Sequence, residues 1–184
     1  MLINASAETL NYTFFGAFAY FMISSSILLV CFRSTRVAGG PFNLKIKRHA
    51  RKRYLKVPLK RDKKIRRLRN RYIIFGCIAA FGFIAQFCIT SLGYPIESIV
   101  VASIVFLLQC YANQFIIEVR NYWKNHDLEI PGVSLIPNWA FKLRLVIILT
   151  SDFSQLIIGV SYAVYFMNYV LPINFDRIQI FKNN

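Results

Sequence analysis

Residues 45–53 and 60–71 read KIKRHARKR and KRDKKIRRLRNR, and they are the densest parts of a basic stretch that covers residues 33–71. This stretch holds 17 of the 23 lysine and arginine residues of the chain and a single acidic residue, Asp62. On each side lies an uncharged apolar run long enough to cross a bilayer, which takes about 20 residues. The sequence therefore predicts a basic segment that is tethered to a membrane at both ends.

The composition indicates one membrane domain over residues 1–184. The chain is 56% hydrophobic and only 17% charged, whereas soluble domains are about a quarter charged. Most of the charge lies in the basic stretch, so the remaining surface is too apolar for a water-solvated fold. We expect no separate soluble domain.

Four apolar runs predict an all-α bundle of four transmembrane helices. The expected spans cover residues 12–32, 72–92, 98–117 and 145–171. A turn between the second and third spans is indicated by Gly93 and Pro95, neither of which continues a helix easily. The long basic loop 33–71 then joins the first two spans, and a second inner loop, 118–144, joins the last two. The leader carries Glu8 and no cation, which favours an uncleaved first span over a signal peptide.

Two local features add detail to the loops. A helix is expected to begin at about residue 59, because Pro58 suits a first turn, and to run straight into the second span. Trp123 and Trp139 are expected at the membrane edges, where aromatic residues form belts.

The charge distribution predicts the orientation. The two loops on one side hold 21 lysine and arginine residues, and the segments on the other side hold two. The positive-inside rule places the basic loops in the cytoplasm, or in the matrix of a mitochondrion, and both termini outside. A bacterial or mitochondrial inner membrane is the expected location.

A polar layer is predicted within the inner part of the membrane. Asp152 is the one formal charge deep in an apolar run, and it lies eight residues, or about 12 Å, past Arg144. Counting from the ends of the spans brings other polar residues to similar depths. The predicted layer contains Ser25, Gln109, Asn113, Asp152 and Gln155. Three interpretations stay open: hydrogen bonds between helices, a proton or substrate site with Asp152 as the titrating group, and contact with a partner subunit.

The basic stretch is the second candidate site, for an anionic partner. Its residues are Lys45, Lys47, Arg48, Arg51, Lys52, Arg53, Lys60, Arg61, Lys63, Lys64, Arg66, Arg67, Arg69 and Arg71. Anionic phospholipid, an acidic protein and nucleic acid could each bind such a segment. Few aromatic residues accompany the cations and no nucleic-acid-binding motif is present, which makes nucleic acid the weakest of the three.

Motifs for catalysis, metals and cofactors are absent from the sequence. His126 lies beside Asp127 and near Glu129, but without the spacing of a metalloprotease site. The four cysteines lie in or beside apolar runs, where small side chains pack between helices. We expect no enzyme activity, no metal and no cofactor.

These patterns predict a non-catalytic, multi-spanning subunit of a larger membrane complex, whose basic loop docks an acidic partner or anionic lipid. A small transporter or channel subunit that uses the layer around Asp152 is the first alternative. A membrane tether for nucleic acid is the second.

Overall fold

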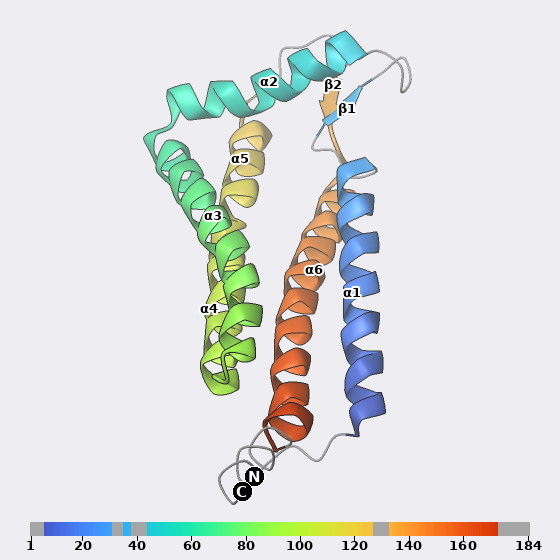
Figure 1. The fold of residues 1–184 in the computed structure, drawn as a ribbon. Coiled ribbons are helices and arrows are strands. Elements are labelled where there is room, and N and C mark those ends of the chain that lie inside the picture. Colours follow the sequence, from blue (N-terminus) through green and yellow to red (C-terminus); the bar gives the residue numbers. More distant parts are fainter. Residues whose placement is uncertain (1–5, 31–34, 38–43, 127–132, 173–184) are drawn as a thin grey trace, which may run out of the picture.

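The computed structural model describes residues 6–30, 35–37, 44–126 and 133–172, and helices make up almost all of this part of the chain (Figure 1). In chain order the elements are α1 (Ala7–Val30), β1 (Thr35–Val37), α2 (Leu44–Arg61), α3 (Lys63–Ser91), α4 (Pro95–Ala112), α5 (Gln114–Lys124), β2 (Val133–Leu135), α6 (Asn138–Tyr165) and the π-helix η1 (Phe166–Val170). The predicted all-α class is confirmed.

Four helical stretches of the described residues are long and apolar enough to cross a membrane. They are Ala7–Leu29, Lys63–Ser91, Pro95–Lys124 and Asn138–Val170. Their lengths of 23, 29, 30 and 33 residues exceed the roughly 20 residues that a bilayer requires. The predicted number of apolar helices is confirmed, and it supports a multi-pass membrane protein. Each helix begins before the predicted span, because polar residues at its N-terminal end continue the helical backbone.

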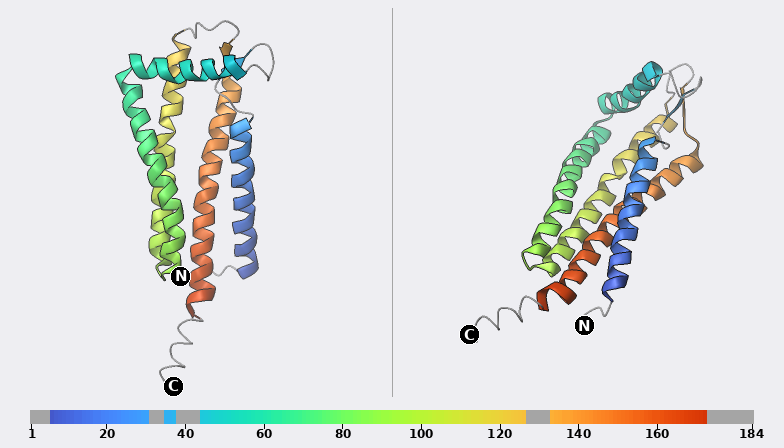
Figure 2. Two further views of the ribbon diagram at one scale, coloured as in Figure 1. Left: turned by 45° about the horizontal axis from the view of Figure 1, so that its top comes forward. Right: turned by 45° about the vertical axis from the view of Figure 1, so that its right-hand side comes forward.

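The long helices form two pairs (Figure 1). In one pair α1 packs against α6, and in the other α3 packs against α4. Contacts between α4 and α6 join the two pairs. At one end of the bundle α2 lies across the ends of the long helices (Figure 2); we call it the basic end. The α3–α4 turn and the start of α1 lie at the opposite end.

The α3–α4 turn explains the tight packing of this pair. Gly93 has φ = +92°, a left-handed conformation that glycine adopts without steric cost. Pro95 follows at the start of α4, where its missing N–H costs nothing. The Ser98 hydroxyl donates a 2.8 Å hydrogen bond to the Gln86 carbonyl and closes the hairpin. The turn predicted at Gly93 and Pro95 is confirmed.

The basic stretch is largely helical instead of a loop. The predicted helix start at about residue 59 was wrong, because α2 already runs through Pro58 and the break falls at Asp62. The Asp62 carboxylate caps α3 by accepting hydrogen bonds from the backbone N–H groups of Lys64 (2.7 Å) and Ile65 (3.4 Å). An aspartate in this role favours a new helix start, and the chain bends there. The expected continuity from the basic segment into the second apolar helix is confirmed in α3.

Pro58 is tolerated inside α2 because its backbone defect is repaired from another helix. Proline has no N–H, so the carbonyl four residues earlier, that of Tyr54, loses its helical donor. The indole N–H of Trp123 in α5 donates a 2.8 Å hydrogen bond to this carbonyl. The Tyr54 and Trp123 rings also stack, with centroids 6.2 Å apart. Trp123 is therefore buried in the protein, and its predicted place in a lipid-facing aromatic belt was wrong, whereas Trp139 is 69% exposed.

A small hydrophobic core at the basic end fixes α2 to the bundle. It consists of Tyr54, Ile65, Phe115, Val119 and Trp123. These residues come from α2, α3 and α5, so one apolar cluster holds three helices. Beside it β1 pairs with β2 in an antiparallel register of Thr35 with Leu135 and Val37 with Val133. The two segments predicted as inner loops are thus joined by a short sheet.

Candidate functional site

The two faces of α2 differ sharply. Its inner face carries three buried residues at intervals of four: Ala50, Tyr54 and Pro58. Its outer face carries four exposed cations, also at intervals of four: Arg48, Lys52, Lys56 and Lys60. We call these four the outward row. The two sets are offset by two residues, or about 200° around a helix of 3.6 residues per turn. The outward row, about 18 Å long at 1.5 Å per residue, therefore points away from the bundle.

A second group of cations surrounds the start of α3. Its exposed members are Lys63, Lys64, Arg66, Arg67, Arg69 and Arg71. Two of them also hold α3 in place. The Lys64 ammonium forms a 2.7 Å ion pair with Glu118 of α5, and Arg71 Nη1 donates a 2.7 Å hydrogen bond to the Tyr111 hydroxyl of α4. This group lies where an apolar helix begins, whereas the outward row lies above it on α2.

The other cations predicted as binding residues are also placed on α2. Arg51 and Arg61 are exposed and Arg53 is half-buried. The side chains of Lys45 and Lys47 lie outside the described part of the chain. The basic stretch thus divides into two surfaces instead of one uniform loop.

Four of the five residues of the predicted polar layer meet between α4 and α6. The Asn113 amide donates a 2.8 Å hydrogen bond to the Asp152 carboxylate, and the Gln109 amide donates a 2.7 Å hydrogen bond to Gln155. The two bonds lie one turn apart. Asn113 also marks the break between α4 and α5. Ser25 lies on α1, and within the described residues no hydrogen bond joins it to this cluster.

A buried amide of α3 lies deeper in the bundle, close to α6. Gln86 is only 2% exposed, and its side chain lies against Gly159. A Cβ atom at Gly159 would stand 2.3 Å from Gln86 Oε1. Any side chain at this position would therefore force the Gln86 amide or one of the two helices to shift. The sequence indicates that Gln86 lies deeper than the polar layer, but it does not reveal this contact.

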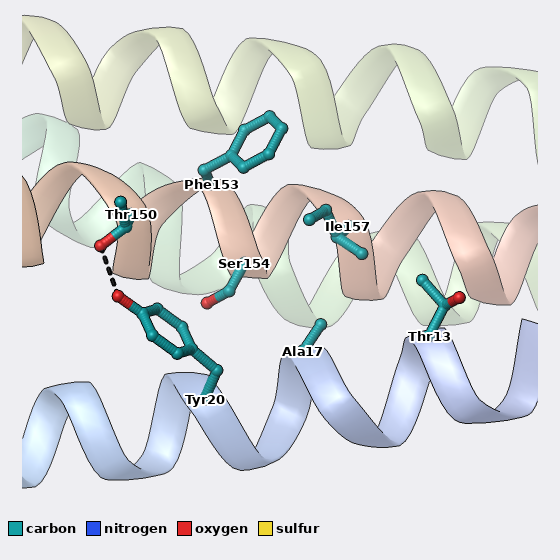
Figure 3. A pocket seen from close by; sticks show the side chains of 7 residues that line it. All are labelled: Thr13, Ala17, Tyr20, Thr150, Phe153, Ser154 and Ile157. Atoms are coloured by element: carbon teal, nitrogen blue, oxygen red, sulfur yellow. Dashed lines mark hydrogen bonds between the residues drawn. The ribbon is translucent and has the colours of Figure 1, made fainter.

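An apolar pocket of about 340 Å³ lies between α1 and α6 (Figure 3). The hydroxyls of Thr13, Tyr20, Thr150 and Ser154 are found among its lining residues. Thr150 Oγ1 donates to the Val146 carbonyl, so in the 2.6 Å contact between Tyr20 and Thr150 the tyrosine hydroxyl is the donor. None of the lining residues is charged, and this hydrogen bond fastens α1 to α6.

The described residues contain little that points to catalysis. No group of three or more His, Cys, Asp or Glu side chains in this part of the chain is arranged to hold a metal ion. Cys77, Cys88 and Cys110 are free thiols. His126 Nδ1 lies 2.8 Å from the Tyr122 carbonyl, and its ring stacks on the Tyr122 ring.

The sequence did not reveal the environment of Arg120. This residue lies one turn before Trp123 on α5 and is only 3% exposed. Arginines at the ends of apolar helices usually extend into water or headgroups, so nothing in the sequence pattern distinguishes it from Lys124.

Comparisons of the chain with protein-family models, curated proteins and solved structures found no match.

Proposed function

We propose that this protein is a non-catalytic, multi-spanning subunit of a larger membrane protein complex, and that the outward row of α2 docks an acidic partner protein. The observation that carries this proposal is the direction of the row. Arg48, Lys52, Lys56 and Lys60 are exposed on a helix whose opposite face is buried against the bundle. Such a row complements an acidic surface, and charge complementarity speeds association and selects the partner.

The packing of α2 favours a protein partner over a lipid surface. An interfacial helix that binds lipid inserts its own apolar face among the acyl chains. In α2 that face is occupied, because Tyr54 belongs to the hydrophobic core shared with α3 and α5. The cations opposite it are exposed, and in the orientation that we propose they face the aqueous phase.

Anionic phospholipid is assigned to the second group of cations. Lys63, Arg66, Arg67 and Arg69 are exposed at the start of α3, next to its apolar part and so at the level of the headgroups. Each cation near an anionic surface contributes about 1 kcal/mol. This group also supports the orientation that we propose, with the basic end in the cytoplasm or the matrix and the chain in a bacterial or mitochondrial inner membrane.

The test is affinity purification in a mild detergent followed by native mass analysis. The test variant replaces the outward row with glutamine (R48Q/K52Q/K56Q/K60Q). The matched control replaces four exposed cations of α3 (K63Q/R66Q/R67Q/R69Q). The wild-type chain and the control are expected in a large assembly, and the test variant as a free 21.4 kDa chain in detergent.

Two outcomes contradict the proposal. A wild-type chain that purifies alone would exclude a stable complex, and an outward-row variant that keeps all its partners would exclude this docking surface. If nuclease treatment releases the partners, the nucleic-acid alternative takes its place.

A second candidate function, a small transporter or channel subunit, is favoured by one observation. The paired Asn113–Asp152 and Gln109–Gln155 side chains bring a carboxyl group and three amides together between two of the long apolar helices. Polar groups inside a membrane commonly serve ion or proton pathways. This function predicts proton or cation flux in vesicles that Asp152→Asn abolishes. The subunit function predicts no flux from the wild-type chain and an unchanged assembly for Asp152→Asn.

A further inference from the structure

Arg120 is a buried cation whose partners among the described residues are all uncharged. Its Nη2 group donates to the Ile136 carbonyl at 2.6 Å and to Asn138 Oδ1 at 3.1 Å. Its Cζ atom lies 4.5 Å from the centre of the Phe141 ring. These contacts fix the guanidinium between α5 and the start of α6, but none of them neutralises its charge.

The other donors of this guanidinium have no partner among the described residues. Nε and Nη1 of Arg120 are buried and have no acceptor within hydrogen-bond distance, which leaves three of the five N–H donors of the group unsatisfied. The described part of the chain contains five acidic residues: Glu8, Asp62, Glu97, Glu118 and Asp152. None of them forms an ion pair with Arg120; Glu118 pairs with Lys64 instead.

The surroundings of Arg120 add further positive potential. Its partner Asn138 is the first residue of α6, a helix of 28 residues whose N-terminus has no side-chain cap. The unsatisfied N–H groups of a helix N-terminus carry a partial positive charge and bind anions. Arg144 follows about two turns along the same helix.

A buried cation without a counter-charge destabilises a fold, and breaking a buried pair is costly for the same reason. A guanidinium beside a helix N-terminus matches the geometry of phosphate oxygens. The site also lies at the basic end, where the long apolar helices end, and the proposed orientation puts headgroup phosphates at this level. We propose that Arg120 and the N-terminus of α6 form a binding site for a phosphate oxyanion, supplied by a phospholipid headgroup or by free phosphate.

Binding is tested on the full-length protein, purified and stripped of lipid in detergent. The thermal midpoint is measured with inorganic phosphate, with phosphatidylglycerol, and with diacylglycerol, which lacks phosphate. Both phosphate-bearing probes are expected to raise the midpoint of the wild-type chain if free phosphate suffices, and phosphatidylglycerol alone if the headgroup is the source. Diacylglycerol is expected to have no effect.

Three variants locate the effect. Arg120→Gln removes the charge and is expected to weaken binding at least tenfold. Arg120→Lys keeps the charge but loses the planar fork, and it gives an intermediate loss; it also serves if the glutamine variant does not fold. Lys142→Gln removes an exposed cation of α6 and is expected to bind as the wild-type chain does.

Three results overturn the proposal. The first is the absence of any midpoint shift in the wild-type chain, and the second is an equal shift in the wild-type chain and both Arg120 variants. The third concerns Asp127 and Glu129, which lie outside the described residues. If D127N/E129Q destabilises the lipid-free chain as strongly as Arg120→Gln and phosphate has no effect on either, the counter-charge of Arg120 is internal.

Discussion

The contact between Gly159 and Gln86 yields a sharp prediction about how the two helix pairs are held together. Replacing Gly159 with alanine places a Cβ atom 2.3 Å from Gln86 Oε1, 2.8 Å from Cδ and 3.1 Å from Nε2. Real Cβ atoms do not approach other atoms this closely. Gln86 is 2% exposed, so either its amide must rotate within the packed bundle or α3 and α6 must move apart.

The magnitude follows from two opposing effects. Overpacking a buried site costs about 1–3 kcal/mol, while alanine is about 1 kcal/mol better than glycine inside a helix. Gly76 offers a matched control, because it lies within α3 and a Cβ atom there meets nothing within 4 Å. Both substitutions gain the same helix propensity. The difference between Gly159→Ala and Gly76→Ala therefore isolates the collision, and we expect it to be about 1–3 kcal/mol in the free energy of unfolding.

The assay is reversible unfolding by SDS in mixed micelles, followed by circular dichroism. Gln86→Ala removes the amide and opens the space that the new methyl group needs. The collision should then shrink, so Gly159→Ala should cost less in a Gln86→Ala background than in the wild-type chain, and the double-mutant cycle should give a coupling of about 0.5–3 kcal/mol. Equal stabilities of Gly159→Ala and Gly76→Ala would refute the close packing of α3 on α6 at this point.

Three further predictions concern other contacts. Trp123→Phe keeps an aromatic ring but removes the indole N–H, so the Tyr54 carbonyl loses its donor. The substitution should destabilise the chain by about 1–3 kcal/mol and increase protease cleavage within α2. Unchanged cleavage would contradict the repair of the proline defect. Gly93→Ala forces a side chain into a left-handed conformation and should cost about 1–2 kcal/mol in the same SDS titration, with Gly76→Ala again as the control. Lys64→Gln and Glu118→Gln each break an ion pair that is 68% and 31% exposed at its two side chains; each should cost less than about 1 kcal/mol, and the loss should fall further in high salt.

The long apolar helices were predictable because bilayer thickness converts directly into run length. The same conversion of residue number into depth places Asn113 and Asp152 at one level from the sequence alone. The hairpin turn was also predictable, since Gly93 and Pro95 act locally through their own backbone preferences. These features depend on composition, helical rise and nearest neighbours, all of which the sequence displays.

The course of α2 could not be predicted, because its cause is not local. Pro58 ordinarily begins or ends a helix, and only the indole N–H of Trp123 makes it acceptable in the interior. The burial of Arg120 is hidden for a similar reason. Charged side chains are almost never fully buried, and the sequence does not show that Phe141 and the start of α6 close over this one.

The repair of the proline defect also has a consequence for how the chain is made. Tyr54 and Trp123 are 69 residues apart in sequence, so at about 5–20 residues per second roughly 3–14 seconds of translation separate them. During this interval α2 exists without the donor that completes its backbone. The basic helix is thus synthesised early, but its backbone is completed only after the third apolar helix has emerged.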